Sequence, residues 1–172
     1  DFESINYFNI LKNNGIEEKE IYKILQARSR DNSRTPMQWN DKENAGFSNA
    51  KPWIEVIYNY KDINVENNLK DENSIFNHYK KLIKLRKDYK VISEGKTIPI
   101  LKDDKNVFAF IREYNNEKLL VINNFYANEC TIDLSSIDFN IKTSKCLISN
   151  YDIAALDNII KLKPYESIVL YK

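Results

Sequence analysis

The chain has 172 residues, 42% of them hydrophobic, which is the size and composition of a globular protein with one ample domain or two small ones. Its 26 lysine and arginine residues nearly balance its 25 aspartate and glutamate residues, so no overall field attracts it to nucleic acid or anionic lipid. Because no apolar run approaches the roughly 20 residues of a membrane span and no basic-then-apolar signal opens the chain, we expect neither a nucleic-acid partner nor a membrane partner.

Metal and redox chemistry have few residues to use. Cys130 and Cys146 lack metal-ligand spacing, and the one histidine, His78, lies in a strongly helical stretch. The sequence therefore predicts no metal site and no cofactor. We expect both cysteines to be reduced and partly buried, which favours a cytoplasmic location. Since the chain begins at Asp1 and runs directly into a helical pattern, we expect it to be cut from something larger.

Two helices are predicted at the start of the chain. Apolar residues recur at helical spacing near residues 3–13, and Gly15 follows where a left-handed C-terminal cap is expected. A second helix begins with acidic residues at 17, 18 and 20, which suit a first turn, and carries an apolar face from Ile21 to Arg28. This second helix leads directly into a polar loop.

The loop from Ser29 to Trp39 carries the most informative chemistry of the chain. Arg30 and Arg34 each offer a rigid fork of donors, Asp31 offers acceptors, and Trp39 offers a flat apolar face. These groups suit a polyhydroxylated or phosphorylated small molecule. The alternative is an ordinary turn, because Asp, Asn, Ser and Pro often bond only their own backbone.

After the loop, residues 40–60 show no sustained period and form an aromatic-rich excursion, whose aromatic side chains we expect to pack and anchor it: Phe47, Trp53, Tyr58 and Tyr60. A short helical turn is predicted within residues 62–69. Capping residues at 71–74 then introduce the clearest helix, with an apolar side and a basic C-terminal half. We interpret the basic residues from Lys80 to Lys87 as a solvated face; the alternative is a salt-sensitive contact with an acidic partner.

Around residues 91–95 alternation replaces helical spacing. Short strands are predicted at 96–101, 107–114, 118–125, 130–134, 144–149, 158–162 and 165–171. A two-residue hairpin turn is expected at Asn115–Asn116, and Asp103 and Asp104 are interpreted as turn acids. Four residues are predicted to be core: Phe108, Phe110, Leu120 and Ile122. The fold class is therefore α+β, with a helical half followed by a small antiparallel sandwich or barrel.

Several segments together resemble the α-amylase superfamily (glycoside hydrolase family 13). The resemblance rests on SRDNSRTPMQW (29–39), NAGF (44–47), KPWI (51–54), NYKDINV (59–65) and SIFNHYKKLIKLRK (74–87), and less strongly on EKLLVINNF (117–125). Within the superfamily the likeness is to α-glucosidases that include oligo-1,6-glucosidases, dextran glucosidases and trehalose-6-phosphate hydrolases. Residues 26–34 and 121–126 are slightly more similar to the trehalose-6-phosphate hydrolases.

The resemblance implies the end of a (β/α)8 TIM barrel, residues 1–90, followed by a C-terminal antiparallel β-sandwich domain, residues 91–172. Retaining glycoside hydrolysis needs two carboxyl groups about 5 Å apart. In the family these groups, and a third that stabilises the transition state, come from barrel strands upstream of this segment. The resemblance therefore implies no catalytic residue here, and we expect the chain alone to be inactive.

One substrate contact carries over by motif. In relatives the second arginine of the RDNxRTP motif contacts the non-reducing-end glucose, which implies this role for Arg34, with Arg30 and Asp31 supporting the loop. The parent would hydrolyse trehalose 6-phosphate to glucose and glucose 6-phosphate. The alternatives are a parent acting on α-1,6-linked oligosaccharides, or a non-catalytic carbohydrate-binding or structural β-module.

Overall fold

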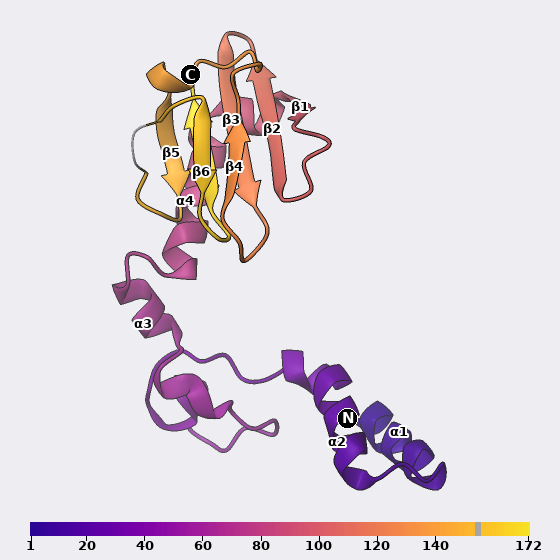
Figure 1. Ribbon diagram of the computed structural model, residues 1–172. Helices are drawn as coiled ribbons and strands as arrows, with labels where there is room; N and C mark the ends of the chain where they lie inside the picture. The colour runs from indigo at the N-terminus through magenta and orange to yellow at the C-terminus, as the bar shows by residue number, and fades with distance from the viewer. Residues whose placement is uncertain (154–155) are drawn as a thin grey trace. The chain divides into compact units, whose positions relative to one another are not determined.

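The computed structural model describes residues 1–153 and 156–172 (Figure 1). The chain divides into two compact units, residues 1–78 and 79–172, and each is described by itself. The resemblance implies a different boundary, between residues 90 and 91, which separates the catalytic barrel from the C-terminal domain in the longer proteins of the family. That domain boundary stays a prediction.

The first unit begins with the two predicted helices, α1 (Phe2–Asn13) and α2 (Glu18–Arg28). The Asp1 carboxylate caps α1 by accepting a hydrogen bond from the Ser4 backbone N–H at 2.8 Å. Gly15 has a φ of 78°, and its N–H bonds the Lys12 carbonyl at 3.0 Å. The left-handed glycine therefore ends α1 as the sequence predicts.

Residues 29–70 contain short helical turns: η1 (Arg30–Ser33), η2 (Glu43–Gly46), η3 (Tyr58–Lys61) and α3 (Val65–Lys70). The prediction that the aromatic side chains anchor this segment is wrong for two of them, because Trp53 is 93% and Tyr58 90% exposed. Amide side chains order the segment instead. Asn44 Nδ2 donates to the Ser48 carbonyl at 3.1 Å, and Asn64 Nδ2 donates to the Tyr60 carbonyl at 2.9 Å.

Helix α4 (Ile75–Asp88) confirms the strongest helix prediction. The Ser74 hydroxyl accepts the Asn77 N–H at 3.2 Å, as a helix cap does. The predicted apolar side is present at helical spacing, but Ile75 and Tyr79 on it are exposed. A short helix, α5 (Lys90–Glu94), follows where the sequence indicates a change to strands, and its Val91 is fully buried.

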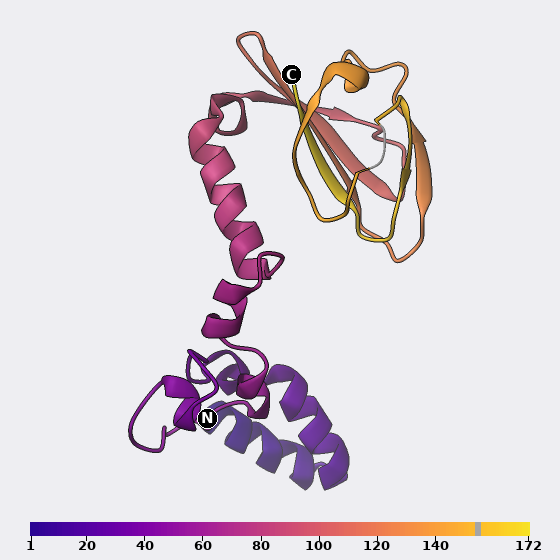
Figure 2. The same cartoon turned by 90° about the vertical axis from the view of Figure 1, so that its left-hand side faces the viewer.

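All seven predicted strands are present, each within two residues of its expected ends. They are β1 (Lys96–Ile100), β2 (Val107–Tyr114), β3 (Glu117–Asn124), β4 (Cys130–Asp133), β5 (Lys145–Ser149), β6 (Ile159–Leu162) and β7 (Ser167–Tyr171). A five-stranded antiparallel sheet has the order β1-β2-β3-β7-β5, and β4 pairs with β6 in a second sheet. The two sheets face each other (Figure 2), which confirms the β-sandwich.

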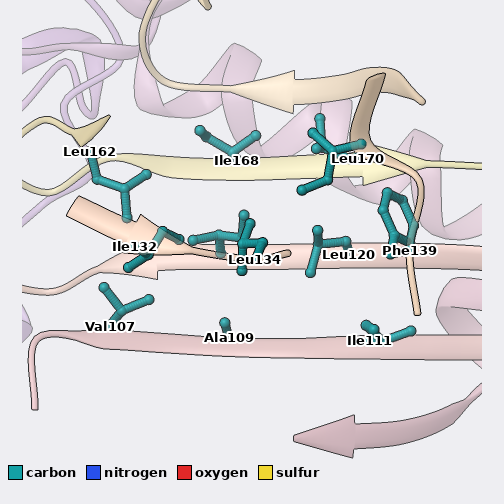
Figure 3. Packing of buried hydrophobic residues seen from close by; sticks show 12 residues of the cluster. Val107, Ala109, Ile111, Leu120, Ile132, Leu134, Phe139, Leu162, Ile168 and Leu170 are labelled. Carbon is teal, nitrogen blue, oxygen red and sulfur yellow. The ribbon is translucent and has the colours of Figure 1, made fainter. Parts of the chain in front are cut away.

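The core lies between the two sheets (Figure 3). Alternate residues of β2, β3 and β7 point into this core: Val107, Ala109, Ile111, Leu120, Ile122, Ile168 and Leu170. There they meet Ile132, Leu134, Leu162 and Phe139. Leu120 and Ile122 are core as predicted. Phe108 and Phe110 are not, because strand side chains alternate and the inner positions of β2 belong to its odd-numbered residues. These two phenylalanines lie on the outer face.

The predicted turns of the second unit have the expected chemistry. Asn115 has a φ of 54° in the two-residue hairpin turn between β2 and β3. Asp104 accepts hydrogen bonds from the backbone N–H groups of Asn106 and Val107 at 2.8 and 3.0 Å, which confirms it as a turn acid.

The Arg112 guanidinium attaches α5 to the sheet. It donates to the carbonyls of Val91 and Gly95 at 3.0 and 2.6 Å and to the Thr97 hydroxyl at 2.6 Å. Gly95 fits here because an added Cβ would lie 2.3 Å from the Val91 carbonyl oxygen. The end of the helix and the start of β1 are therefore held by one side chain.

Candidate functional site

The polar loop of residues 29–39 begins as a compact turn. The Ser29 N–H bonds the Leu25 carbonyl at 2.8 Å, Asn32 Nδ2 donates to the Gln26 carbonyl at 2.6 Å, and the Ser33 hydroxyl donates to the Arg30 carbonyl at 3.0 Å. Asn32 and Ser33 therefore behave as the turn interpretation predicts. These local hydrogen bonds close the turn, so the charged side chains of the loop are not needed to close it.

The other end of the loop is fixed to the start of α3. The carbonyls of Gln38 and Trp39 accept the N–H groups of Val65 and Glu66 at 2.9 and 3.0 Å. The Gln38 side chain also donates to the Ile63 carbonyl at 2.5 Å. These donors belong to the first turn of a helix, where backbone N–H groups have no intrahelical partner. The loop thus caps α3 with its own backbone.

A left-handed turn supports the same end. Asn44, Ala45 and Gly46 have φ values of 51°, 56° and 66°, and the buried Ala45 carbonyl accepts the N–H groups of Trp39 and Asn40 at 2.9 and 3.2 Å. An added Cβ on Gly46 would lie 2.5 Å from the Asn40 side chain. Sequence reasoning missed this support, although Asn44 and Gly46 are residue types that tolerate a positive φ.

Each of the three predicted site residues takes part in an ion pair. Asp31 Oδ1 lies 3.5 Å from Arg34 Nη1. Arg30 Nη1 lies 3.5 Å from Glu3 Oε2 on α1. The 3₁₀ turn η1 brings Asp31 and Arg34 together because they are three residues apart. The Arg34 side chain is 49% exposed, so its fork remains accessible to a ligand.

A groove of about 610 Å³ lies between α1 and α2. Its lining residues include Arg30, Ser29 and the apolar side chains of Tyr7, Ile10 and Leu25. Asp31 and Arg34 are not among them. The structure therefore pairs Asp31 with Arg34, pairs Arg30 with Glu3, and does not place the three predicted residues in one cavity.

The chemistry available to this loop is binding. An arginine fork donates two parallel hydrogen bonds to a carboxylate, a phosphate or vicinal hydroxyls. Within residues 1–153 and 156–172, no group of three or more His, Cys, Asp or Glu side chains is placed to hold a metal ion. In the same part of the chain, no helix is both long and apolar enough to cross a membrane.

Family models match most of the chain. Residues 3–95 match the catalytic domain of α-amylase, and residues 107–169 match the C-terminal domain of the α-amylase SusG. Because the first match covers more than half of the chain, the chain belongs to the α-amylase family. The resemblance stated from the sequence is confirmed.

Individual members of the family are similar to the chain over almost its whole length. A trehalose-6-phosphate hydrolase of Bacillus subtilis (strain 168) is 47% identical over 98% of this chain, and an oligo-1,6-glucosidase of Bacillus cereus is 42% identical over 98%. The crystal structure of Bacillus licheniformis trehalose-6-phosphate hydrolase matches 99% of the chain with 50% identity and a TM-score of 0.88. The chain spans about 30% of the length of the curated relatives and 31% of that structure.

Proposed function

We propose that this chain is the C-terminal part of a retaining α-glucosidase that hydrolyses trehalose 6-phosphate to glucose and glucose 6-phosphate. The observation that carries the proposal is the 47–50% identity to trehalose-6-phosphate hydrolases over almost the whole chain. We also propose that the protein is cytoplasmic. Both cysteines are free, as is usual in a reducing compartment.

In the proposed reaction, this segment contributes to sugar binding, and the rest of the longer protein supplies the reacting carboxyl groups. Retaining hydrolysis needs a carboxylate nucleophile and a carboxylic acid on opposite sides of the scissile bond, and both would come from barrel strands outside the chain. Arg34 donates hydrogen bonds to hydroxyls of the non-reducing-end glucose. Its pairing with Asp31 holds the guanidinium near the turn, and Arg30 ties the loop to α1 through Glu3.

The test is the activity of the longer protein and of its Arg34→Ala variant. The longer protein should release glucose from trehalose 6-phosphate, and this chain alone should release none. Loss of a charged hydrogen bond of about 1.5–3 kcal/mol predicts a fall in kcat/KM of roughly 10- to 150-fold for Arg34→Ala. Arg30→Ala is the matched control and should change kcat/KM less, because Arg30 pairs with Glu3 and is not proposed to touch sugar. Glucose release from neither trehalose 6-phosphate nor α-1,6-linked oligosaccharides would refute the proposal.

A second candidate is hydrolysis of α-1,6-linked oligosaccharides, supported by 42% identity to an oligo-1,6-glucosidase over 98% of the chain. The same assay separates the two, because one enzyme should prefer isomaltose and the other trehalose 6-phosphate. A purely carbohydrate-binding β-module is tested by titrating the isolated chain with maltose, isomaltose or trehalose 6-phosphate. Binding with no activity in the longer protein would favour that role.

A further inference from the structure

The position of the Arg34 side chain depends on the residues that follow it in the chain. Hydrogen bonds from Asn32 and Ser33 close the turn on the upstream side of Arg34. The ion pair with Asp31 keeps the guanidinium near the turn, but a 3.5 Å pair with a half-exposed arginine does not fix one geometry. The direction of the arginine fork is therefore set by residues 35–39.

Residues 35–39 form a short, stiff link between Arg34 and α3. Pro36 is buried, and its ring restricts the backbone φ. Gln38 Nε2 donates to Asn59 Oδ1 at 3.2 Å as well as to the Ile63 carbonyl at 2.5 Å. Together with the backbone bonds to the first turn of α3 described above, these contacts hold the link against the start of that helix.

The buried side chain of Asn64 holds the start of α3 together. Asn64 is only 3% exposed. Its Oδ1 accepts the Asn67 backbone N–H at 2.8 Å and so caps the helix. Its Nδ2 donates to the carbonyls of Tyr60 and Lys61 at 2.9 and 3.3 Å. One amide therefore bonds the turn η3 to the cap of α3.

The donor half of the Asn64 amide has a task of its own. A helix cap needs only an acceptor, and aspartate supplies one as well as asparagine does. Aspartate has no donor for the Tyr60 and Lys61 carbonyls, and its carboxylate would repel their oxygens. Asn64→Asp therefore keeps the cap of α3 and removes the bonds to η3.

We propose that Asn64 is a positioning residue for Arg34: by fixing the start of α3, it fixes residues 35–39 and with them the direction of the arginine fork. Asn64 itself does not touch sugar. The inference rests on the proposed function, in which Arg34 donates hydrogen bonds to the substrate. Such bonds depend on geometry, because displacement of a substrate-binding group by about 1 Å can lower the rate roughly 100-fold.

The experiment is a double-mutant cycle on kcat/KM of the longer protein, with the substrate that its wild type hydrolyses. Asn64→Asp should lower kcat/KM by roughly 10-fold in the wild-type background and by less than about 2-fold once Arg34→Ala has removed the fork. Equal losses in both backgrounds overturn the proposal, because a merely structural role does not depend on Arg34.

Asn77→Ala is the matched control for Asn64→Asp. It removes amide bonds to the Asn68 and Asp71 carbonyls, at the other end of α3, and should leave kcat/KM within about 2-fold in both backgrounds. A loss as large as that of Asn64→Asp would mean that any disturbance of α3 impairs the enzyme, and it also overturns the proposal.

Hydrogen exchange of the longer protein without substrate gives a readout that does not need hydrolysis. The amides of residues 39–40 and 65–66 should exchange several-fold faster in Asn64→Asp and at an unchanged rate in Asn77→Ala. Unchanged exchange in Asn64→Asp overturns the positioning role even in an active enzyme. Absence of glucose release from the wild type is a different outcome: it refutes the proposed function, while the exchange still shows whether Asn64 holds the link.

A second variant serves if Asn64→Asp does not fold. Gln38→Met keeps the size of the side chain and removes its hydrogen bonds to Asn59 and to the Ile63 carbonyl. It should lower kcat/KM several-fold in the wild-type background and by less than about 2-fold together with Arg34→Ala. The same loss in both backgrounds overturns the coupling between the start of α3 and Arg34.

Discussion

The two units differ in how much apolar surface they bury by themselves. In residues 79–172, the inner residues of the five-stranded sheet meet those of β4 and β6 in one continuous core. In residues 1–78, Ile21 and Ala45 are fully buried, while Trp53 and Tyr58 are almost fully exposed. Since burial of apolar area is the main favourable term in folding, the second unit should carry most of the chain's own stability. Much of the first unit is held by turns and helix caps rather than by a continuous hydrophobic core.

The largest effect on stability is expected for a substitution in the core of the second unit. Leu120→Ala removes a fully buried side chain and should lower the free energy of unfolding by about 2–5 kcal/mol. Trp53→Ala in the first unit is the control and should change it by no more than about 0.5 kcal/mol, because the ring is exposed. Urea unfolding followed by circular dichroism measures both. Similar losses for the two variants would contradict the difference between the units.

A smaller effect is expected where α5 joins the sheet. Arg112→Ala removes three hydrogen bonds, including those to the Val91 and Gly95 carbonyls, and should cost about 1.5–3 kcal/mol. Arg112→Lys is the control: it keeps the charge but cannot reproduce the fork, so it should restore only part of the loss. Hydrogen exchange of residues 90–100 should accelerate in the alanine variant. Unchanged exchange there would mean that the side chain does not hold the junction.

The smallest effect concerns a surface ion pair of the second unit. Asp138 accepts a hydrogen bond from Lys118 Nζ at 2.5 Å, and this bond lowers the pKa of the Asp138 carboxyl below its ordinary value of 3.8. The contribution is therefore fully present above the ordinary pKa and is lost as the pH falls through the lowered one. Comparing the wild type with Asp138→Asn, the stability difference should be constant near neutral pH and shrink in acid. A stability difference between the two proteins that grows as the pH falls would contradict the prediction.

The strands were predictable from sequence because a period of two leaves a strong signal over five to eight residues. The same signal does not identify the inner face at Phe108 and Phe110, because a strand that is apolar on both faces does not reveal whether its odd- or even-numbered residues point inward. Helix α5 has five residues, too few to show a helical period. Tertiary contacts, namely the Arg112 hydrogen bonds and the burial of Val91, hold it in place.

The position of the candidate loop and its flanking helices followed from local patterns. The pairing of Asp31 with Arg34 depends on the tight turn between them, and the pairing of Arg30 with Glu3 joins residues far apart in sequence. A sequence without an alignment contains no signal for such a distant pair. The sequence predicts that the aromatic side chains of residues 47–60 pack, but it does not predict the exposure of Trp53, because composition does not identify a ring's neighbours.

The Arg112 attachment has a consequence for protein engineering. Arg112 recognises two carbonyls that precede β1, and Gly95 leaves no room for a side chain beside the first of them. A graft of this sheet onto another protein that cuts after Gly95 would discard two of the three groups that accept hydrogen bonds from Arg112. A graft that cuts before Lys90 would carry the helix, the glycine and the arginine together, so the transplanted module should begin there.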